Sequence, residues 1–81
     1  MCMVNKVKDI DGELDYITSC LTDLGFVLIA KTISHRVFEN TSISWQVNVN
    51  SRTAKLDVYN YDDVKVLSES TITQLISIIA W

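Results

Sequence analysis

The stretch from Ile43 to Tyr61 constrains the fold most, because hydrophobic residues recur in it at every second position. Apolar and polar side chains alternate from Ile43 to Val49, and the alternation resumes from Leu56 to Val58 after a polar break at residues 50–53. A period of two is typical of a strand with one buried face. The stretch therefore predicts a β-hairpin whose inner face carries the core and whose outer face meets solvent.

Residues 10–24 have the spacing of an amphipathic helix. Their hydrophobic side chains fall at i, i+4, i+7, i+11 and i+14, on one helical stripe: Ile10, Leu14, Ile17, Leu21 and Leu24. Asp9 or Asp11 can cap the N-terminus, and Gly25 suits the left-handed position that ends a helix. Residues 1–8 are expected to form an extended or mobile lead-in.

A second helix is expected near the C-terminus. Thr71 followed three residues later by Gln74 fits a capping box, and a helical stripe follows: Ile72, Leu75, Ile76 and Ile79. The stretch from Val64 to Leu67 either begins this helix or forms a fourth strand. Two β-branched valines on either side of a lysine favour the strand.

The segment from Phe26 to Glu39 is rich in β-branched and aromatic residues and predicts one long strand. Its first part, residues 26–30, is apolar on both faces. A strand of that kind is central in its sheet or is covered on its second side. We therefore expect residues 26–30 to be buried.

The strand registers follow from the requirement that hydrophobic side chains share a face. A three-residue turn at 40–42 pairs Val37 with Trp45, whereas a two-residue turn would place Arg36 on the core face. A two-residue loop at 51–52 then sets inward-pointing partners opposite each other: Val49 and Ala54, Val47 and Leu56, Trp45 and Val58.

Together these elements predict an α+β fold of order α-β-β-β-(β)-α, an antiparallel meander sheet with two helices packed on one face. The 81 residues make a single domain, residues 1–81. Cys2 and Cys20 are too few for a disulfide scaffold and are expected to be free thiols. Because the sequence shows neither a signal-peptide pattern nor an apolar run of bilayer length, we expect a cytoplasmic protein without membrane contact.

No pattern in the sequence predicts catalysis, a cofactor or a metal site. It holds no phosphate loop, no paired-cysteine metal pattern and no glycine-framed nucleophile. The single histidine leaves Cys20 with His35 as the one conceivable nucleophile and base. The ordinary expectation is that His35 either faces inward near a sheet edge, opposite Val47, where it hydrogen-bonds a backbone carbonyl, or is simply exposed. The adjacent carboxylates of Asp62 and Asp63 lack the further oxygen ligands of a cation site.

The outer face of the hairpin and the turn that follows form the predicted partner-binding surface. Six residues make up this surface: Lys55, Asp57, Tyr59, Tyr61, Asp62 and Asp63. Exposed tyrosines are enriched at binding hot spots. The sequence thus predicts a small non-enzymatic protein-interaction module, with an inhibitor encoded by a phage or mobile element as one form, which binds and blocks a larger host protein. Trp81 either closes the core or anchors a partner.

The order α-β-β-β-α resembles that of the double-stranded-RNA-binding domain. That family contacts phosphates through a lysine-rich start of its second helix, where this chain has residues 68–71, Ser-Glu-Ser-Thr. RNA binding is therefore not implied. The order is also similar to that of some small phage-encoded inhibitors of bacterial defence systems, which implies a protein partner.

Two alternatives belong to other functional classes. A nucleic-acid-binding domain would use Tyr59 and Tyr61 as stacking platforms beside four basic residues: Arg36, Arg52, Lys55 and Lys65. The net charge of −3 argues against it, because binding by phosphate neutralisation needs a basic stripe. A homodimeric regulatory protein would be joined by sheet edges or by Trp81.

Overall fold

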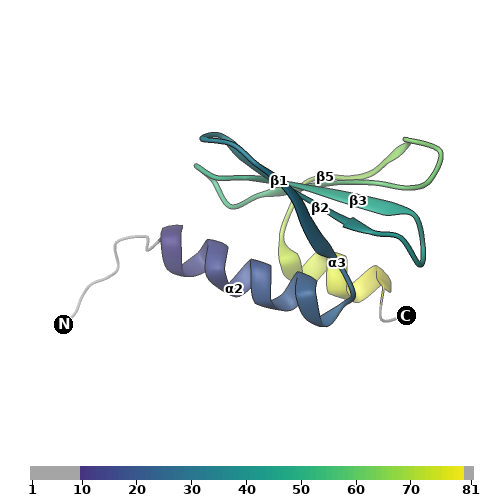
Figure 1. Cartoon of the computed structure of the whole chain (residues 1–81), viewed down its shortest axis with the longest axis horizontal. Coiled ribbons are helices and arrows are strands. Elements are labelled where there is room, and N and C mark those ends of the chain that lie inside the picture. Colours follow the sequence, from purple (N-terminus) through teal and green to yellow (C-terminus); the bar gives the residue numbers. More distant parts are fainter. Residues whose placement is uncertain (1–9, 80–81) are drawn as a thin grey trace.

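The computed structural model describes residues 10–79, and this part of the chain forms a helix, five strands and a second helix (Figure 1). The elements are α2 (Ile10–Asp23), β1 (Val27–Lys31), β2 (His35–Asn40), β3 (Trp45–Asn50), β4 (Leu56–Tyr59), β5 (Lys65–Ser70) and α3 (Ile72–Ile79). The strands form one antiparallel meander in the order β1-β2-β3-β4-β5. The predicted fold class is confirmed. The expectations for residues 1–8, Cys2, Asp9 and Trp81 lie outside the described residues.

The core lies between the sheet and the two helices, which are on the same side of it (Figure 1). The predicted stripe of α2 supplies Leu14, Ile17 and Leu21, and α3 supplies Ile72 and Leu75. From the sheet come the inward residues of the alternating stretch, all at most 1% exposed: Val47, Val49, Leu56 and Val58. The alternation therefore identified the buried face correctly from Trp45 to Val58, whereas Ile43, predicted to point inward, lies in the preceding loop and is 41% exposed.

The predicted long strand at residues 26–39 is instead a hairpin, β1 and β2. The chain reverses at residues 32–34, where Thr32 N–H donates to the His35 carbonyl at 2.8 Å and Thr32 Oγ1 accepts from His35 N–H at 3.0 Å. This turn has neither glycine nor proline, so β propensity alone does not reveal it. The predicted strand at residues 64–67 is confirmed, since β5 covers Lys65–Ser70.

The predicted register between β2 and β3 is wrong. Asn40 pairs with Trp45 and Arg36 with Val49, because the loop has four residues and not three. Arg36 consequently lies on the helix side of the sheet, where its Nη1 donates to Thr18 Oγ1 of α2 at 3.4 Å. A long arginine side chain can follow an apolar surface to a polar partner, so the rule that kept Arg36 off this face was too strict.

The loop between β3 and β4 is also two residues longer than predicted, spanning residues 51–54. Val47 therefore pairs with Val58, and Val49 with Leu56. A shift of two residues keeps every side chain on its face, whereas a shift of one would invert the set. The inward residues were predicted correctly and their partners were not.

Three hairpin loops begin with an asparagine, and these asparagines are ten residues apart: Asn40, Asn50 and Asn60. In each loop the side-chain oxygen accepts a hydrogen bond from the N–H two residues later, at 2.9, 2.8 and 2.9 Å respectively. Each loop then returns through a non-glycine residue with positive φ: Ser44, Ala54 and Asp63. Asparagine side chains thus organise turns that more often rely on glycine or proline.

The end of α2 is closed at Gly25, as predicted. Gly25 has φ +93°, and its N–H donates to the Thr22 carbonyl at 3.0 Å. Phe26 N–H donates to the Leu21 carbonyl at 2.8 Å. These two hydrogen bonds form the Schellman motif, which needs a left-handed residue at this position.

Asn40 joins the end of α2 to the sheet. Its Nδ2 donates to the Leu24 carbonyl at 3.0 Å, and its Oδ1 accepts from Ser42 N–H at 2.9 Å. Asn40 is buried, and both polar groups of its side chain are satisfied by backbone partners. One side chain therefore fixes both a helix end and a hairpin loop.

The predicted capping box starts α3. Thr71 N–H donates to Gln74 Oε1 at 2.8 Å, and Gln74 N–H donates to Thr71 Oγ1 at 3.2 Å. The preceding residue, Ser70, is buried and donates from its hydroxyl to the Leu56 carbonyl at 3.1 Å. These contacts place the first turn of α3 against β4.

We expect Gly25→Ala to lower the free energy of unfolding by about 1–2 kcal/mol, measured by urea denaturation. The alanine would have to adopt the left-handed backbone conformation of Gly25, and its Cβ would lie 3.1 Å from Asn40 Nδ2. Gly25→Asn separates the two causes, because asparagine tolerates the left-handed region but meets the same neighbour. Ser19→Ala, at an exposed site on α2, is the control. An unfolding curve for Gly25→Ala that coincides with wild type would contradict this account.

Candidate functional site

Two of the six predicted partner-binding residues, Asp57 and Tyr59, lie together on the outer face of β4. Lys65 of β5 joins them, with its Nζ 3.9 Å from Asp57 Oδ1 and 5.6 Å from the centroid of the Tyr59 ring. We call these three residues the outer-face cluster. Sequence reasoning missed Lys65 as a member of this cluster, because its place depends on the pairing of β5 with β4.

The other four predicted residues lie outside this cluster. Tyr61, Asp62 and Asp63 belong to the loop after β4, and Tyr61 is 72% exposed. Lys55 directly precedes β4 and lines two small cavities, one of them together with Asp57. The structure therefore divides the predicted surface into a strand cluster, a neighbouring lysine and a separate loop tip.

Asp57 also has a structural contact. Its Oδ1 accepts a hydrogen bond from Glu69 N–H at 2.9 Å, and Glu69 has a positive φ of 48°. Hydrogen bonds to a carboxylate are stronger than neutral ones. Asp57 thus holds an unusual backbone conformation in β5 and also takes part in the outer-face cluster.

The most exposed apolar segment is β1, one of the two edge strands of the sheet (Figure 1). All five of its residues are exposed, and Val27, Leu28 and Ile29 keep 64%, 42% and 52% of their surface. We call residues 27–31 the β1 edge. The expectation that residues 26–30 are buried holds for Phe26 and is wrong for the rest. A sequence segment that is apolar on both faces has the same pattern whether the folded protein covers the strand or leaves it exposed.

The two sheet edges differ in chemistry. At the β1 edge the register shifts between Leu28 and Ala30, so Ile29 has no partner in β2. The β5 edge has two register shifts and two charged residues, Lys65 and Glu69. Charges and irregularities are the devices that keep strand edges from pairing with other chains. The two edges therefore differ in degree: the β5 edge has two register shifts and two charges, whereas the β1 edge has one register shift and a single lysine at its end.

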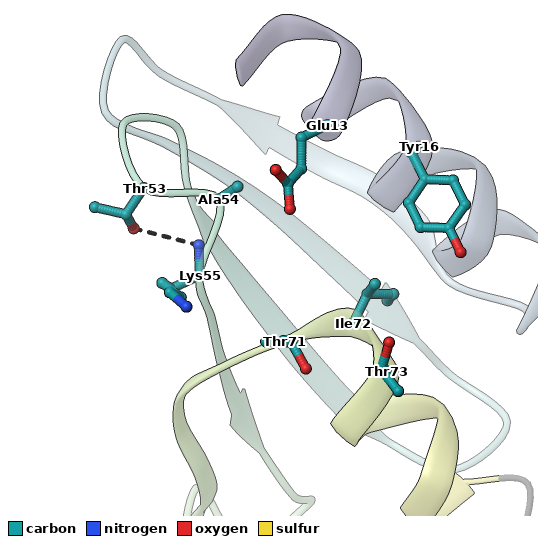
Figure 2. A pocket seen from close by; sticks show the side chains of 8 residues that line it. All are labelled: Glu13, Tyr16, Thr53, Ala54, Lys55, Thr71, Ile72 and Thr73. Atoms are coloured by element: carbon teal, nitrogen blue, oxygen red, sulfur yellow. Dashed lines mark hydrogen bonds between the residues drawn. The ribbon is translucent and has the colours of Figure 1, made fainter. Parts of the chain in front are cut away.

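Two open cavities, of about 290 and 330 Å³, lie near the loop between β3 and β4. Figure 2 shows the first, where Glu13 and Tyr16 of α2 lie across from Thr71 and Thr73 at the start of α3. The second is lined by polar and charged residues: Asn50, Thr53, Lys55, Asp57 and Glu69. Pockets for small organic ligands are mostly apolar, so these cavities do not define a ligand site.

Cys20 and His35 are not brought together. Cys20 packs against the core from α2, whereas His35 is on the outer side of β2, paired with Asn50. The expectation that His35 points inward opposite Val47 is wrong, and its Nδ1 lies 2.9 Å from Ser34 Oγ. Within residues 10–79, no group of three or more His, Cys, Asp or Glu residues is arranged to hold a metal ion.

Tyr16 and Cys20 are neighbours on successive turns of α2. A side-chain hydrogen bond with Cys20 raises the pKa of Tyr16 above its ordinary value, and charge repulsion from the thiolate adds to the effect. Tyr16 remains exposed, so this pair is a local feature of the helix surface.

In the described part of the chain, no helix has the length and hydropathy needed to cross a membrane. No known protein family, curated protein or solved structure matches this chain. The functional argument therefore depends on the surfaces described above.

We expect Asp57→Ala to lower the free energy of unfolding by about 1 kcal/mol in urea denaturation, because Glu69 N–H loses its acceptor. Lys65→Ala should cost less than about 0.5 kcal/mol, since a solvent-exposed ion pair contributes little. Asp57→Asn keeps an acceptor oxygen and serves as the matched control. A loss for Lys65→Ala as large as that for Asp57→Ala would show that the ion pair, and not the backbone hydrogen bond, is the main contribution.

Proposed function

We propose that this protein is a small, non-catalytic protein-interaction module. The observation that carries the proposal is the β1 edge, where three large apolar side chains are exposed on a strand that pairs on one side only. An open apolar edge readily pairs with a strand from another chain, and such strand addition is a common mode of protein recognition.

The outer sheet face extends this surface. Val27 at the β1 edge pairs with Glu39, and the face continues through Gln46 and Asn48 of β3 to the outer-face cluster. Apolar residues on one side with polar and aromatic residues beyond them match the core and rim of a protein interface. A partner at the β1 edge would therefore also meet polar groups that fix its orientation.

The form of activity that we favour is blocking, in which the module covers a surface of a larger protein. An inhibitor encoded by a phage or mobile element would act in this way. The net charge of −3 suits a partner whose contact surface is basic.

The positions of the basic residues favour a protein partner over a nucleic acid. Arg36 lies on the helix side of the sheet, and Lys65 is on the outer face beside Asp57. Arg52 and Lys55 lie in or next to the loop between β3 and β4. These residues do not form the single basic stripe that nucleic-acid binding requires.

The test is affinity capture from an extract of the native host, with three tagged forms of the chain as bait. We expect wild type to recover a stoichiometric protein partner and Ile29→Lys to lose it, because a lysine at the edge opposes strand addition. Val64→Lys is the matched control. Val64 is 56% exposed and Ile29 52%, but Val64 directly precedes β5, the edge strand opposite to β1. Circular dichroism of all three forms checks the fold. Recovery of no stoichiometric partner, or equal recovery by Ile29→Lys, would contradict the proposal.

A further inference from the structure

We propose that the β1 edge pairs antiparallel with the β1 edge of a second copy of this chain. A two-fold axis between the copies would join the two five-stranded sheets into one continuous sheet. This inference rests on the proposed function, because both assign the β1 edge to protein contact; in the absence of the larger partner the second copy occupies that edge, and the two compete for it.

The charges at the two ends of β1 identify the occupant. At its C-terminal end, Lys31 pairs with Arg36, so this end is basic. At its N-terminal end, on the same helix side of the sheet as Lys31, β1 follows the last turn of α2, which ends at Asp23 and contains no basic residue. Antiparallel pairing places each basic end beside an acidic end, twice in one dimer. Parallel pairing would place like charges together, and a foreign strand need not carry this pattern.

The groups of opposite charge also lie on the same side of the sheet. Lys31 and Arg36 share the helix side, because Arg36 Nη1 reaches Thr18 of α2. The C-terminal end of α2 is on that same side. In the dimer, Lys31 of one copy approaches the last turn of α2 in the other copy, where Asp23 and the negative end of the helix dipole both favour a cation.

The asymmetry between the two edges limits assembly to two copies. Once the β1 edges of two copies have paired, neither copy has a free β1 edge. The β5 edge has two register shifts and two charged residues, against one of each at the β1 edge, so it offers a poorer template for a further strand. A five-residue strand is about 17 Å long, and its contact covers less than the roughly 800 Å² per partner of a typical stable complex. We therefore expect a reversible dimer that forms with rising protein concentration.

Sedimentation velocity of the full chain, from about 1 µM to about 1 mM, tests the dimer. A reducing agent keeps Cys2 from cross-linking the copies. We expect wild type and Val64→Lys to shift from monomer to dimer across this range and Ile29→Lys to remain monomeric. A wild type that stays monomeric throughout, or a dimer that Ile29→Lys leaves intact, would overturn the inference.

A charge exchange tests the antiparallel orientation. Lys31→Glu and Asp23→Lys should each weaken the dimer about tenfold or more, because each places like charges together at both symmetric contacts. The double variant should restore dimerisation by exchanging the two charges. Failure of the double variant to recover, with both single variants impaired, would overturn the antiparallel arrangement.

Amide hydrogen exchange of wild type gives a measurement that needs no variant. Amides of residues 27–31 that face the open edge should become protected as the concentration rises, while those of β5 should not change. Concentration-independent exchange in β1 would overturn the inference.

The outcomes separate the two proposals. If wild type remains monomeric but captures a partner that Ile29→Lys loses, the edge accepts a foreign strand, so the dimer is overturned and the proposed function stands. If wild type dimerises through β1 but captures no stoichiometric partner, the dimer stands and the proposed blocking function does not.

Discussion

Burial of one sheet face beneath two helices is the constraint on which the rest of the structure depends. Side chains of β3 and β4 alternate between this core and solvent, so the position of the helices decides which residues form the outer face. The same arrangement leaves β1 without cover, because the buried strand residues belong to β2, β3 and β4 and to Ser70 at the end of β5. The packing of the helices on the sheet thus determines both the core and the exposed surface.

Much of this fold could be predicted from the sequence, because hydrophobic periodicity and capping patterns are local. The helix stripe of α2, Gly25 and the Thr71–Gln74 box all occur where the pattern placed them. Strand registers could not be predicted. Between β3 and β4 a shift by two residues keeps the same side chains buried, and between β2 and β3 the prediction excluded Arg36 from the face on which it lies. Loop length decides between such registers, and asparagine side chains set it through hydrogen bonds that periodicity does not report.

The candidate site was less predictable than the fold. Asp57 and Tyr59 were found because alternation places them outward, but Lys65 reaches them only through the pairing of a later strand. The β1 edge was predicted to be buried, since hydrophobicity alone does not distinguish a covered strand from an open one. That distinction depends on strand order, which is a property of the whole sheet.

The loops after Asn40 and Asn50 have the same length and the same place for their left-handed residue, at opposite ends of the sheet. In each loop the first residue accepts from the N–H two positions on, but the surroundings differ: Asn40 is bound to the end of α2, and Ser51 N–H donates to the Ser34 carbonyl in the turn between β1 and β2. One local hydrogen-bonding pattern thus closes two hairpins and attaches each of them to a different neighbouring segment.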